Sequence, residues 1–545
     1  MHTSSTIPAR QRFGFVPLGS LGAQPLPGTE NASGDTLFWA PDSHRLAFEA
    51  DKKLKKIDID GGGVQTLGDA PLLPLPGAWN KDGVILLGSV LDGAFGIVRI
   101  SDSGGTPVRV TTADPSNGVQ LLPKFLPDGR HFLFHILRGD QSGFSGGIYL
   151  GSLDSKSATR QELPVATGPN MGAAYAQGYL LFPRDKTLFA QPFDPVRGIL
   201  GGEPSPLGEN VSQNFSVSET GVLVYGAVSG QSGESTASRL SWFDRNGKPA
   251  GEVSTPGKVG SIRLFQDGRI ALDNVGGLGP DSDGDIWVVD ARGVPIKVTS
   301  ENPNFDGFPV WSPDGMRLAF GSLHRKGLPL IKLYQKSSNG LGAAEPLLLS
   351  NADDIALDFP LDWTPNNIVF QRLKPANRAS EIWLLSMPEK KTSVYLNNGF
   401  NNIQARVSPD GRYLAYATSE SGSGSVQIVV QTFPDPKINR WQITANGGSQ
   451  PVWKPDGREL YYLAPDGKLM AVAVKSGPTF EAGQASELFQ TPLRRGQQNP
   501  FGNHYAVSND GQRFLIVSGS NTSATSGDAI PITAIVNWTA MLRKK

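Results

Sequence analysis

The residues best suited to chemistry in this sequence are three carboxylates in a short acidic run, Asp281, Asp283 and Asp285. Their alternate spacing gathers several oxygen atoms in one loop, and oxygen atoms are the ligands that Ca²⁺ binds. The run lacks the later bidentate Glu of an EF-hand loop. The sequence therefore makes these residues a candidate calcium site, with an acidic turn before the strand at 286–290 as the alternative. No other cofactor is expected.

Two further patterns match known catalytic or metal-binding spacings, and both have simpler structural readings. The run GFSGG at 143–147 fits the G-x-S-x-G pattern of hydrolases, but that pattern requires a following helix, and the next segment reads as a strand. His131 and His135 have the spacing of helical zinc ligands, but HFLFH reads as a strand, which separates them by about 13 Å. The chain has no Cys, which excludes Cys-ligated zinc, thiol catalysis and disulfides. We therefore expect no catalytic residue.

Composition narrows the classes of partner. Lys plus Arg and Asp plus Glu number 50 each, so no basic excess favours nucleic acid. No stretch approaches the roughly 18 apolar residues of a membrane span, and the N-terminus lacks the apolar core of a signal peptide. We therefore expect no nucleic-acid partner and no membrane segment in this chain. A cytoplasmic location is expected if Met1 is the true start.

One turn recurs along the chain and must position any site. Its clearest copy is Ser312-Pro313-Asp314-Gly315, in which Pro presets the turn and Gly adopts the left-handed conformation. Adjacent copies lie about 40 to 54 residues apart, as in propeller or solenoid repeats. The eleven copies are APDSHRLAF (40–48), NKDGVILL (80–87), LPDGRHFLF (126–134), AQGYLLF (176–182), SETGVLVY (218–225), FQDGRIAL (265–272), SPDGMRLAF (312–320), TPNNIVF (364–370), SPDGRYLAY (408–416), KPDGRELYY (454–462) and SNDGQRFLI (508–516).

Another short strand follows each turn, and most units then contain a further short strand. The strand is LSWFD (240–244) after the fifth turn and ITAIVNW (532–538) after the eleventh. Each unit thus holds about four antiparallel strands, which is a β-propeller blade. We therefore predict an all-β fold of tandem β-propellers with about 11 to 12 four-stranded blades. One large or interleaved propeller is the alternative.

A tryptophan accompanies several of the turns. It lies three residues before the turn Asp at Trp39, Trp79, Trp311 and Trp453, and Trp363 has the same register before Asn366. One indole per blade at a fixed position predicts packing between blades. In MRLAF, Leu318 and Phe320 share one face of the strand and Ala319 lies on the other.

The Gly/Ser-rich stretch 226–238 is the best seam between two propellers. We predict an N-terminal propeller of about five to six blades at 1–235 and a C-terminal propeller of about six blades at 236–545. The last unit lacks a fourth strand, and the segment 13–26 is a candidate to supply it. In that case the two propellers would not be simply consecutive.

The repeat resembles the TolB/WD40-like (PD40) propeller repeat, with its x-W-S-P-D-G-x-x-[IL]-[AV]-[FY] core. The whole chain resembles the C-terminal extracytoplasmic sensor-like region of acidobacterial-type bacterial serine/threonine kinases. The matching segments are KLKKIDIDGGGVQTL, GAWNKDGVIL, FLPDGRHFLF, GIYLGSLDSK, GYLLFPRDKTLFAQPFD, GVLVYG, LSWFDRNGK, SQPVWKPDGRELYYLAPDGKLMAVAV and PITAIVNWTAML. The Gly-rich loop and the Val-Ala-Ile-Lys, His-Arg-Asp and Asp-Phe-Gly motifs of kinases are absent from this sequence, so the resemblance carries over no kinase residue. It implies an extracytoplasmic or periplasmic sensing role.

Our leading hypothesis is a non-catalytic scaffold that binds a protein or small-molecule ligand with its loops or its axial channel. By resemblance, it would be the sensing part of a receptor kinase-like protein. One alternative is a TolB-like component of an envelope protein complex. The other is a propeller hydrolase or lyase with a site in the channel.

Overall fold

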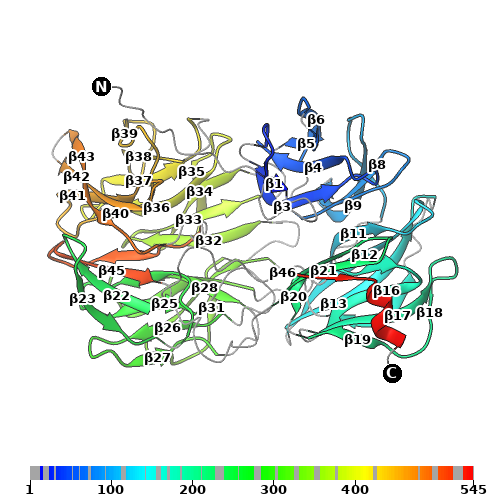
Figure 1. Cartoon of the computed structure of the whole chain (residues 1–545). Coiled ribbons are helices and arrows are strands. Elements are labelled where there is room, and N and C mark those ends of the chain that lie inside the picture. The colour runs from blue at the N-terminus through cyan, green and yellow to red at the C-terminus, as the bar shows by residue number, and fades with distance from the viewer. Residues whose placement is uncertain are drawn as a thin grey trace. The chain divides into compact units, whose positions relative to one another are not determined.

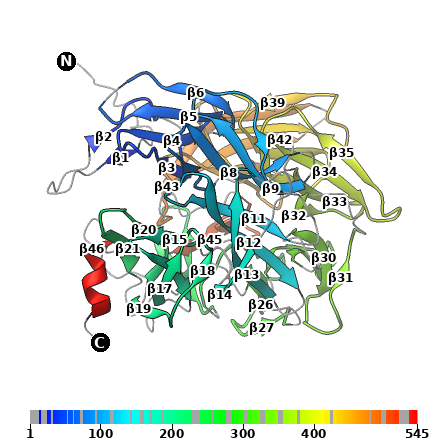
Figure 2. The ribbon, with the colours of Figure 1, turned by 90° about the vertical axis from the view of Figure 1, so that its right-hand side faces the viewer.

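The computed structural model (Figures 1 and 2) contains strands and one short 3-10 helix, η2 (Trp538–Arg543), in the parts of the chain that it describes. No helix in these parts is long and apolar enough to cross a membrane. The described residues are 13–15, 24–29, 32–51, 53–60, 62–70, 75–91, 94–111, 118–140, 143–154, 161–167, 172–184, 187–209, 211–227, 239–255, 257–274, 284–300, 305–323, 330–348, 356–374, 379–421, 426–476, 479–493, 501–518 and 532–543.

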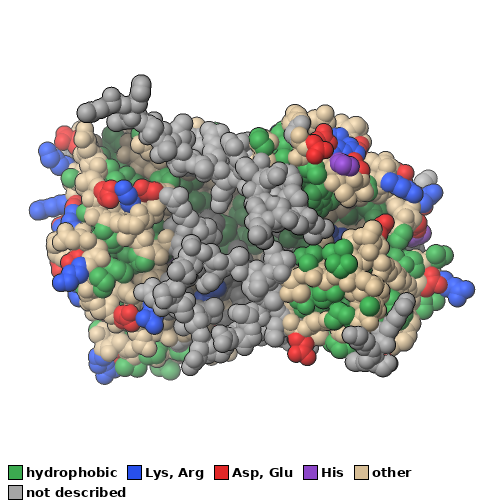
Figure 3. All heavy atoms as spheres, viewed as in Figure 1, with side chains coloured by type: hydrophobic (Ala, Val, Ile, Leu, Met, Phe, Trp, Pro, Cys, Tyr) green, Lys and Arg blue, Asp and Glu red, His purple; other side chains and the backbone are tan. Residues whose placement is uncertain are grey.

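The chain divides into two compact units. Unit 1 comprises Met1–Asp140, Phe144–Gly230 and Ala529–Lys545, and unit 2 comprises Gln231–Asp528 with Gln141–Gly143. Both consist of antiparallel sheets of mostly four strands, which are propeller blades. The predicted all-β propeller fold is thereby confirmed. On the face shown in Figure 3, Lys and Arg side chains lie interspersed with those of Asp and Glu.

Unit 1 contains five blades and a small hairpin within the described residues, and we name each blade by its first strand. In the β15 blade, β19 pairs with β17 as a fifth strand. The strands are β1 (Gly14–Phe15) and β2 (Gln24–Pro25); β3 (Ala32–Trp39), β4 (Arg45–Ala50), β5 (Lys53–Asp58) and β6 (Gln65–Asp69); β7 (Ala78–Trp79), β8 (Val84–Leu91), β9 (Ala94–Ser101) and β10 (Val108–Arg109); β11 (Val119–Phe125), β12 (His131–Asp140), β13 (Gly143–Ser152) and β14 (Gln161–Thr167); β15 (Ala174–Ala176), β16 (Tyr179–Arg184), β17 (Thr187–Asp194), β18 (Ile199–Leu200) and β19 (Ser205–Gly208); and β20 (Val211–Val217), β21 (Val222–Ala227) and β46 (Ile532–Val536).

Unit 2 contains six four-stranded blades within the described residues. One of them, the closing blade, combines the first two strands of the unit, β22 (Arg239–Asp244) and β23 (Pro249–Val253), with its last two, β44 (Tyr505–Val507) and β45 (Arg513–Ser518). The others are β24 (Ile262–Leu264), β25 (Ile270–Asp273), β26 (Ile286–Val289) and β27 (Pro295–Lys297); β28 (Asp306–Trp311), β29 (Arg317–Ser322), β30 (Lys332–Ser337) and β31 (Glu345–Pro346); β32 (Leu357–Trp363), β33 (Asn367–Leu373), β34 (Ser380–Ser386) and β35 (Thr392–Leu396); β36 (Asn402–Val407), β37 (Tyr413–Thr418), β38 (Gln427–Thr432) and β39 (Arg440–Gln442); and β40 (Ser449–Trp453), β41 (Glu459–Leu463), β42 (Lys468–Ser476) and β43 (Phe480–Gln490).

The recurrent turn connects the first two strands of a blade, as its residue types predict. At Ser312–Gly315, the Gly315 N–H donates to the Ser312 carbonyl (2.8 Å), and Gly315 has φ of 66°. The Asp314 carboxylate accepts from the Met316 N–H (3.0 Å) and the Ser312 hydroxyl (2.5 Å). In the first copy of the turn, Ser43 takes the left-handed conformation instead, with φ of 59°. These contacts close the hairpin, so the Ser and Asp of the turn are structural.

Six hydrophobic clusters, one at each junction between neighbouring blades, close unit 2 into a ring. Trp311 packs with Leu318 and Phe320 against the preceding β24 blade, whereas Ala319 faces the following β32 blade. Trp363 and Trp453 also pack against the preceding blade. The predicted inter-blade role of the indole is thus confirmed at these positions. Its partner was not predicted: the guanidinium of Arg269, in the preceding blade, lies 4.7 Å from the Trp311 ring centre.

Unit 1 repeats this packing with one exception. Trp79 packs against the β3 blade, and the Arg45 guanidinium lies 5.1 Å from its ring centre. Trp39, at the same register in the first blade of the chain, is 49% exposed. The expectation that every such indole is packed is therefore wrong for Trp39, because no blade precedes β3 in the chain to cover it.

Two strands belong to different blades from those expected. LSWFD, expected to complete the fifth unit, forms β22 and pairs with β45. ITAIV, expected to complete the eleventh, forms β46 and pairs with β21 (Figure 2). Both are short apolar strands that fit either position, and each was assigned to the nearest turn in sequence. Long-range pairing decides instead, so unit 2 is inserted in the chain between β21 and β46 of unit 1.

The predicted limits of the propellers change accordingly. The division at Gly230 and Gln231 falls inside the Gly/Ser-rich seam, but the C-terminal segment belongs to unit 1, which corrects the range 236–545. The segment 13–26 was a candidate fourth strand for the last blade. Its described strands β1 and β2 instead pair with each other, and Phe13 and Leu26 pack on the β3 blade.

Candidate binding site

The predicted calcium ligands are only partly described. Asp281 and Asp283 lie outside the described residues. Asp285 forms an ion pair with Lys297, with the Asp285 Oδ2 2.7 Å from the Lys297 Nζ, and its N–H donates to the Asn274 side chain at 2.8 Å. The described part of the chain holds no group of three or more His, Cys, Asp or Glu side chains arranged for a metal ion. The calcium site therefore stays a prediction.

The hydrolase-like and zinc-like patterns fall on strands. The run at 143–147 is the start of β13, which continues as a strand to Ser152, so the turn and helix of a hydrolase elbow do not follow it. His131 and His135 are both in β12. His131 contacts the carboxylate of Asp128 (2.5 Å), whereas His135 is buried, and burial lowers the pKa of His135 to about 4. Both patterns therefore lie on strands, as the sequence predicts.

The innermost strands of the six blades, which include β44 in the closing blade, line the centre of unit 2. β24 contacts β44 and β28, and contacts continue from β28 through β32 and β36 to β40. The ring closes where the Tyr505 hydroxyl, in β44, donates to the Gln450 carbonyl at 2.8 Å. Residues of equal register on these strands therefore lie at a similar depth around a common axis.

A chain of hydrogen bonds joins three blades at this centre. Gln404, Gln450 and His504 each lie six residues before the turn Asp of their blade. The side-chain oxygen of Gln404 accepts from the Gln450 N–H, and that of Gln450 accepts from the His504 N–H, both at 2.8 Å. Gln404 and Gln450 have φ of 57° and 54°, at bulges in β36 and β40. The Gln404 side chain thus satisfies an N–H that the β40 bulge removes from the sheet ladder, and the Gln450 side chain satisfies an N–H just before β44.

His504 is held in its neutral form. Burial lowers the pKa of His504 to about 4. The Gln450 Nε2 lies 3.0 Å from the His504 Nδ1. Because an amide nitrogen only donates, Nδ1 is the acceptor and the ring proton is on Nε2.

Two arginines meet at the centre at a second register, four residues before the turn Asp. Arg263, from the β24 blade, reaches past the β28 blade and donates from Nη2 to the Leu361 carbonyl at 3.2 Å. Arg406, from the β36 blade, donates to the same carbonyl. The other blades carry Val310, Asp362, Val452 and Ala506 at this register. A side chain that skips one blade must extend toward the axis, so the two guanidinium groups converge there.

Burial dominates the electrostatics of this cluster. It lowers the pKa of Arg263 to about 10, against the opposing field of Asp362 and Asp273. Burial also raises the pKa of Asp362, against hydrogen bonds from the N–H groups of Val407 (2.8 Å) and Trp363 (3.0 Å). Arg406 is 8% exposed, whereas Arg263 and Asp362 keep part of their surface accessible to water. Arg263 therefore remains protonated at neutral pH.

An aromatic cluster spans the ring nearer the start of the inner strands. Phe359, in β32, stacks on Phe501, just before β44, with ring centres 4.3 Å apart. Phe308, in β28, contacts both rings edge-on. Because the closing blade and the β32 blade are opposite members of the six, this contact crosses the axis. The arginines lie at the next register, toward the turns.

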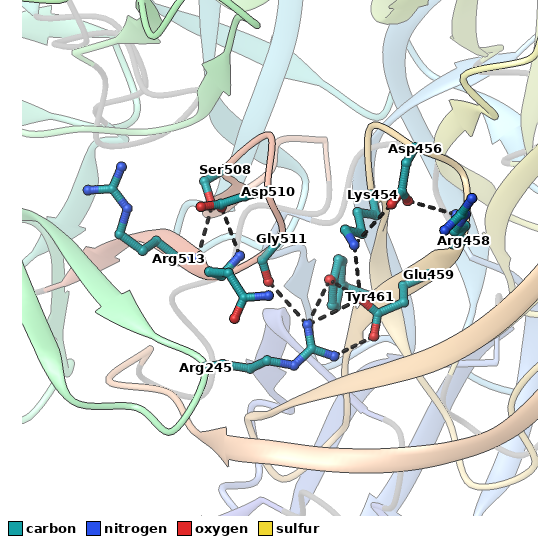
Figure 4. A network of polar contacts seen from close by, with 11 residues as sticks. Arg245, Lys454, Asp456, Arg458, Glu459, Tyr461, Ser508, Asp510, Gly511 and Arg513 are labelled. Atoms are coloured by element: carbon teal, nitrogen blue, oxygen red, sulfur yellow. Dashed lines mark hydrogen bonds and ion pairs between the residues drawn. The ribbon is translucent and has the colours of Figure 1, made fainter.

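The polar network of Figure 4 connects the closing blade to the β40 blade. Arg245, in the turn between β22 and β23, forms an ion pair with Glu459. It also donates to the Tyr461 hydroxyl (3.2 Å) and the Gly511 carbonyl (3.1 Å). Burial opposes ionisation of Glu459, but hydrogen bonds from Arg245 and Tyr461 outweigh it and keep the pKa of Glu459 below its ordinary value. All four groups bond to one another within the protein, so the network stabilises the closure of the ring.

A shallow groove of about 350 Å³ lies beside two turns, between the closing blade and the β24 blade. Trp242, Phe265 and Arg513 line it, and the Arg513 guanidinium lies 5.0 Å from the Trp242 ring centre. Here the β24 blade has Leu264 in place of the usual indole. The smaller side chain leaves space at this junction. The groove is a second surface on which a ligand could rest.

Sequence reasoning missed the central arginines. A signal was present: Arg263 and Arg406 occupy a register at which three of the other blades have Val or Ala. Aligning the copies on the turn Asp exposes this difference. That they converge on one carbonyl requires the closed ring.

Comparisons with known proteins give a fold likeness only. No family model and no curated protein matches the chain. Similar solved structures include a protein from Agrobacterium tumefaciens described as TolB (17% identity, 52% of this chain and 99% of that one, TM-score 0.38). TolB from Acinetobacter baumannii (14%, 72% and 81%, 0.31) and a gluconolactonase from Xanthomonas campestris (12%, 52% and 92%, 0.37) are also similar. These low values assign neither a family nor a function.

Proposed function

We propose that this chain is a non-catalytic binding scaffold whose ligand engages the centre of unit 2. One observation carries the proposal. The outer positions of the blades repeat the same apolar packing, whereas the inner strands carry charged and polar residues that differ from blade to blade. Arg263, Asp362 and Arg406 share one register with Val and Ala. Packing between blades accounts for the apolar residues that recur in every blade. It does not account for the charged residues on the inner strands.

The proposed role is sensing a protein or small-molecule ligand, as part of a receptor kinase-like protein in an extracytoplasmic compartment. The support is the resemblance of ordered segments along the chain to the sensor-like region of such kinases. Reading the DNA upstream of the Met1 codon tests this context. An in-frame kinase and membrane span would support it. A stop codon close upstream would contradict it and favour a TolB-like component of an envelope complex.

Hydrogen–deuterium exchange of the full chain tests the binding function. The chain is incubated with fractionated pools of peptides and small molecules, and we expect a binding pool to protect β24, β32 and β36. Protection confined to the turns beside Trp242 and Phe265 would move the site to the groove. A turnover assay with glycosides, peptides and lactones is run in parallel. Activity that Asp362→Asn abolishes would overturn the non-catalytic assignment.

A further inference from the structure

We propose that Arg263 and Arg406 form a binding site for an oxyanion, a carboxylate or phosphoryl group, at the centre of unit 2. The proposal rests on the binding function proposed above and names the chemistry of the ligand. Its basis is a mismatch between hydrogen-bond donors and acceptors. Each guanidinium has five N–H donors, and both direct their closest one to a single acceptor, the Leu361 carbonyl.

The remaining donors lack strong partners. The Nε of Arg263 is buried without a hydrogen-bond partner, and the Arg263 Nη1 has only a long contact of 3.5 Å with the Ile262 carbonyl. Within the described residues, no ion pair joins Arg263 or Arg406 to a carboxylate. A buried charge without a hydrogen-bonded counter-ion is strongly unfavourable. A bidentate oxyanion would supply acceptors to the remaining Nη groups of the two arginines, since its geometry matches the guanidinium fork.

The nearest carboxylates already bind other groups. Asp362 accepts the N–H groups of Val407 and Trp363. Asp273 accepts the Ser261 N–H (2.8 Å) and hydroxyl (2.5 Å), and the Phe308 N–H (2.8 Å). Both carboxylates make the local electrostatic potential more negative, but neither accepts a hydrogen bond from Arg263 or Arg406. Their field disfavours a dianion, so a monoanionic carboxylate should bind more tightly than phosphate at neutral pH.

The site also discriminates against a simple halide. Two guanidinium groups on one carbonyl present several N–H donors, and a carboxylate or phosphoryl group has two or more oxygen atoms to accept them. Chloride has a single centre and gains less from this arrangement. The proposal therefore predicts a preference for oxyanions at equal ionic strength.

Thermal unfolding of the full chain tests the site with the monoanionic carboxylates acetate and propionate, and with phosphate, against chloride at matched ionic strength. We expect the oxyanions to raise the Tm of one transition by about 5 °C at a concentration of about 100 times their Kd, with the carboxylates acting at lower concentration. Arg406→Gln should reduce this rise at least several-fold. Arg292→Gln, which removes an arginine of unit 2 whose side chain is 83% exposed, is the matched control and should retain it. Asp362→Asn should lower the concentration of oxyanion required.

Two further variants keep the test decisive. If Arg406→Gln loses its fold by circular dichroism, Arg263→Gln and the conservative Arg406→Lys are compared instead. Lys keeps the charge without the fork and should bind roughly tenfold more weakly. An equal rise with chloride, or an unchanged rise in a folded variant that lacks either arginine, would overturn the site. If no oxyanion stabilises the wild-type chain while another ligand protects β24, β32 and β36, this proposal fails and the binding function stands.

Discussion

At the scale of single residues, the recurrent turn and the inner strands have different tasks. Gly315 takes its left-handed conformation in a hairpin that Ser312 and Asp314 close, and the same set recurs at Ser408 and Asp410. These residues are structural wherever they occur. The polar residues of the inner strands form hydrogen bonds with groups in neighbouring blades, and they differ from copy to copy. A substitution there should therefore have an effect that depends on which blade carries it.

His504 illustrates such a position, and its titration should control acid stability. Its pKa is lowered to about 4 from an ordinary value of 6.5, so below pH 6.5 the unfolded chain binds a proton that the folded chain does not. Stability is therefore lost as pH falls from about 6.5 to about 4, by roughly 3 kcal/mol at the limit. His504→Gln should remove this contribution from the urea unfolding of unit 2 between these pH values, whereas the contribution of the buried His135 to unit 1 should remain.

The exposed His44 provides the control for this measurement. Its side chain is 71% exposed, so His44→Gln should leave the pH dependence as it is in the wild type. A His504→Gln variant that loses stability in acid as steeply as the wild type would contradict the assignment of the buried neutral ring.

At the scale of elements, neighbouring blades pack together through recurring hydrophobic clusters and a few specific hydrogen bonds and ion pairs. Trp311 packs on the preceding blade, and Arg269 covers its ring. The closing blade differs, because its outer strands, β22 and β23, come from the start of unit 2 and its inner strands from the end. The ion pair between Arg245 and Glu459 therefore secures the junction at which the two ends of unit 2 meet.

Glu459→Gln should weaken that junction. The Arg245 guanidinium would keep a neutral partner in place of a carboxylate, at a cost of about 1–2 kcal/mol at neutral pH. The pKa of Glu459 is lowered in the folded chain, so the stabilisation is present above the unfolded pKa of a Glu and is lost as pH falls through the folded pKa. Urea unfolding should show the variant and the wild type converging in acid.

A matched exposed pair distinguishes this effect from a general loss of charge. Lys468 and Glu487 form an ion pair of 2.7 Å on neighbouring strands of the β40 blade, with the two side chains 35% and 51% exposed. Glu487→Gln should change stability by less than about 0.5 kcal/mol. An equal effect of the two substitutions would show that the junction is not specially stabilised.

At the scale of the whole molecule, unit 1 is built from residues that lie both before and after unit 2 in the sequence. After the insertion of unit 2, β46 completes the β20 blade, and Trp538 at the start of η2 is fully buried among Leu181, Leu188 and Leu207. A large buried side chain at the end of the sequence ties the C-terminal segment to strands formed far earlier. The stability of unit 1 should therefore depend on its last residues.

Trp538→Ala tests this dependence. Removing the buried indole should destabilise unit 1 by about 3–5 kcal/mol and leave the unfolding of unit 2 unchanged, as measured by calorimetry of the full chain. Met541, in the same short helix, is 43% exposed, so Met541→Ala should have little effect. Equal losses in the two variants would contradict the proposed anchoring role of Trp538.

The sequence by itself determined the blade and its internal packing. Turn chemistry and strand alternation act between adjacent residues, so Ser312–Gly315 and the two faces of Leu318 and Ala319 were readable from one copy. The recurrence of the turn at near-constant spacing then determined the propeller class. The placement of His135 and of the segment after the run at 143–147 on strands followed from the same local patterns.

Only the tertiary structure decided which strands pair and which side chains meet. LSWFD and ITAIV are both short apolar strands, and nothing within five residues distinguishes the blade that each completes. Their pairing is a long-range choice set by ring closure. The convergence of Arg263 and Arg406 on the Leu361 carbonyl likewise depends on the closed ring, which brings distant copies of one register to a common axis.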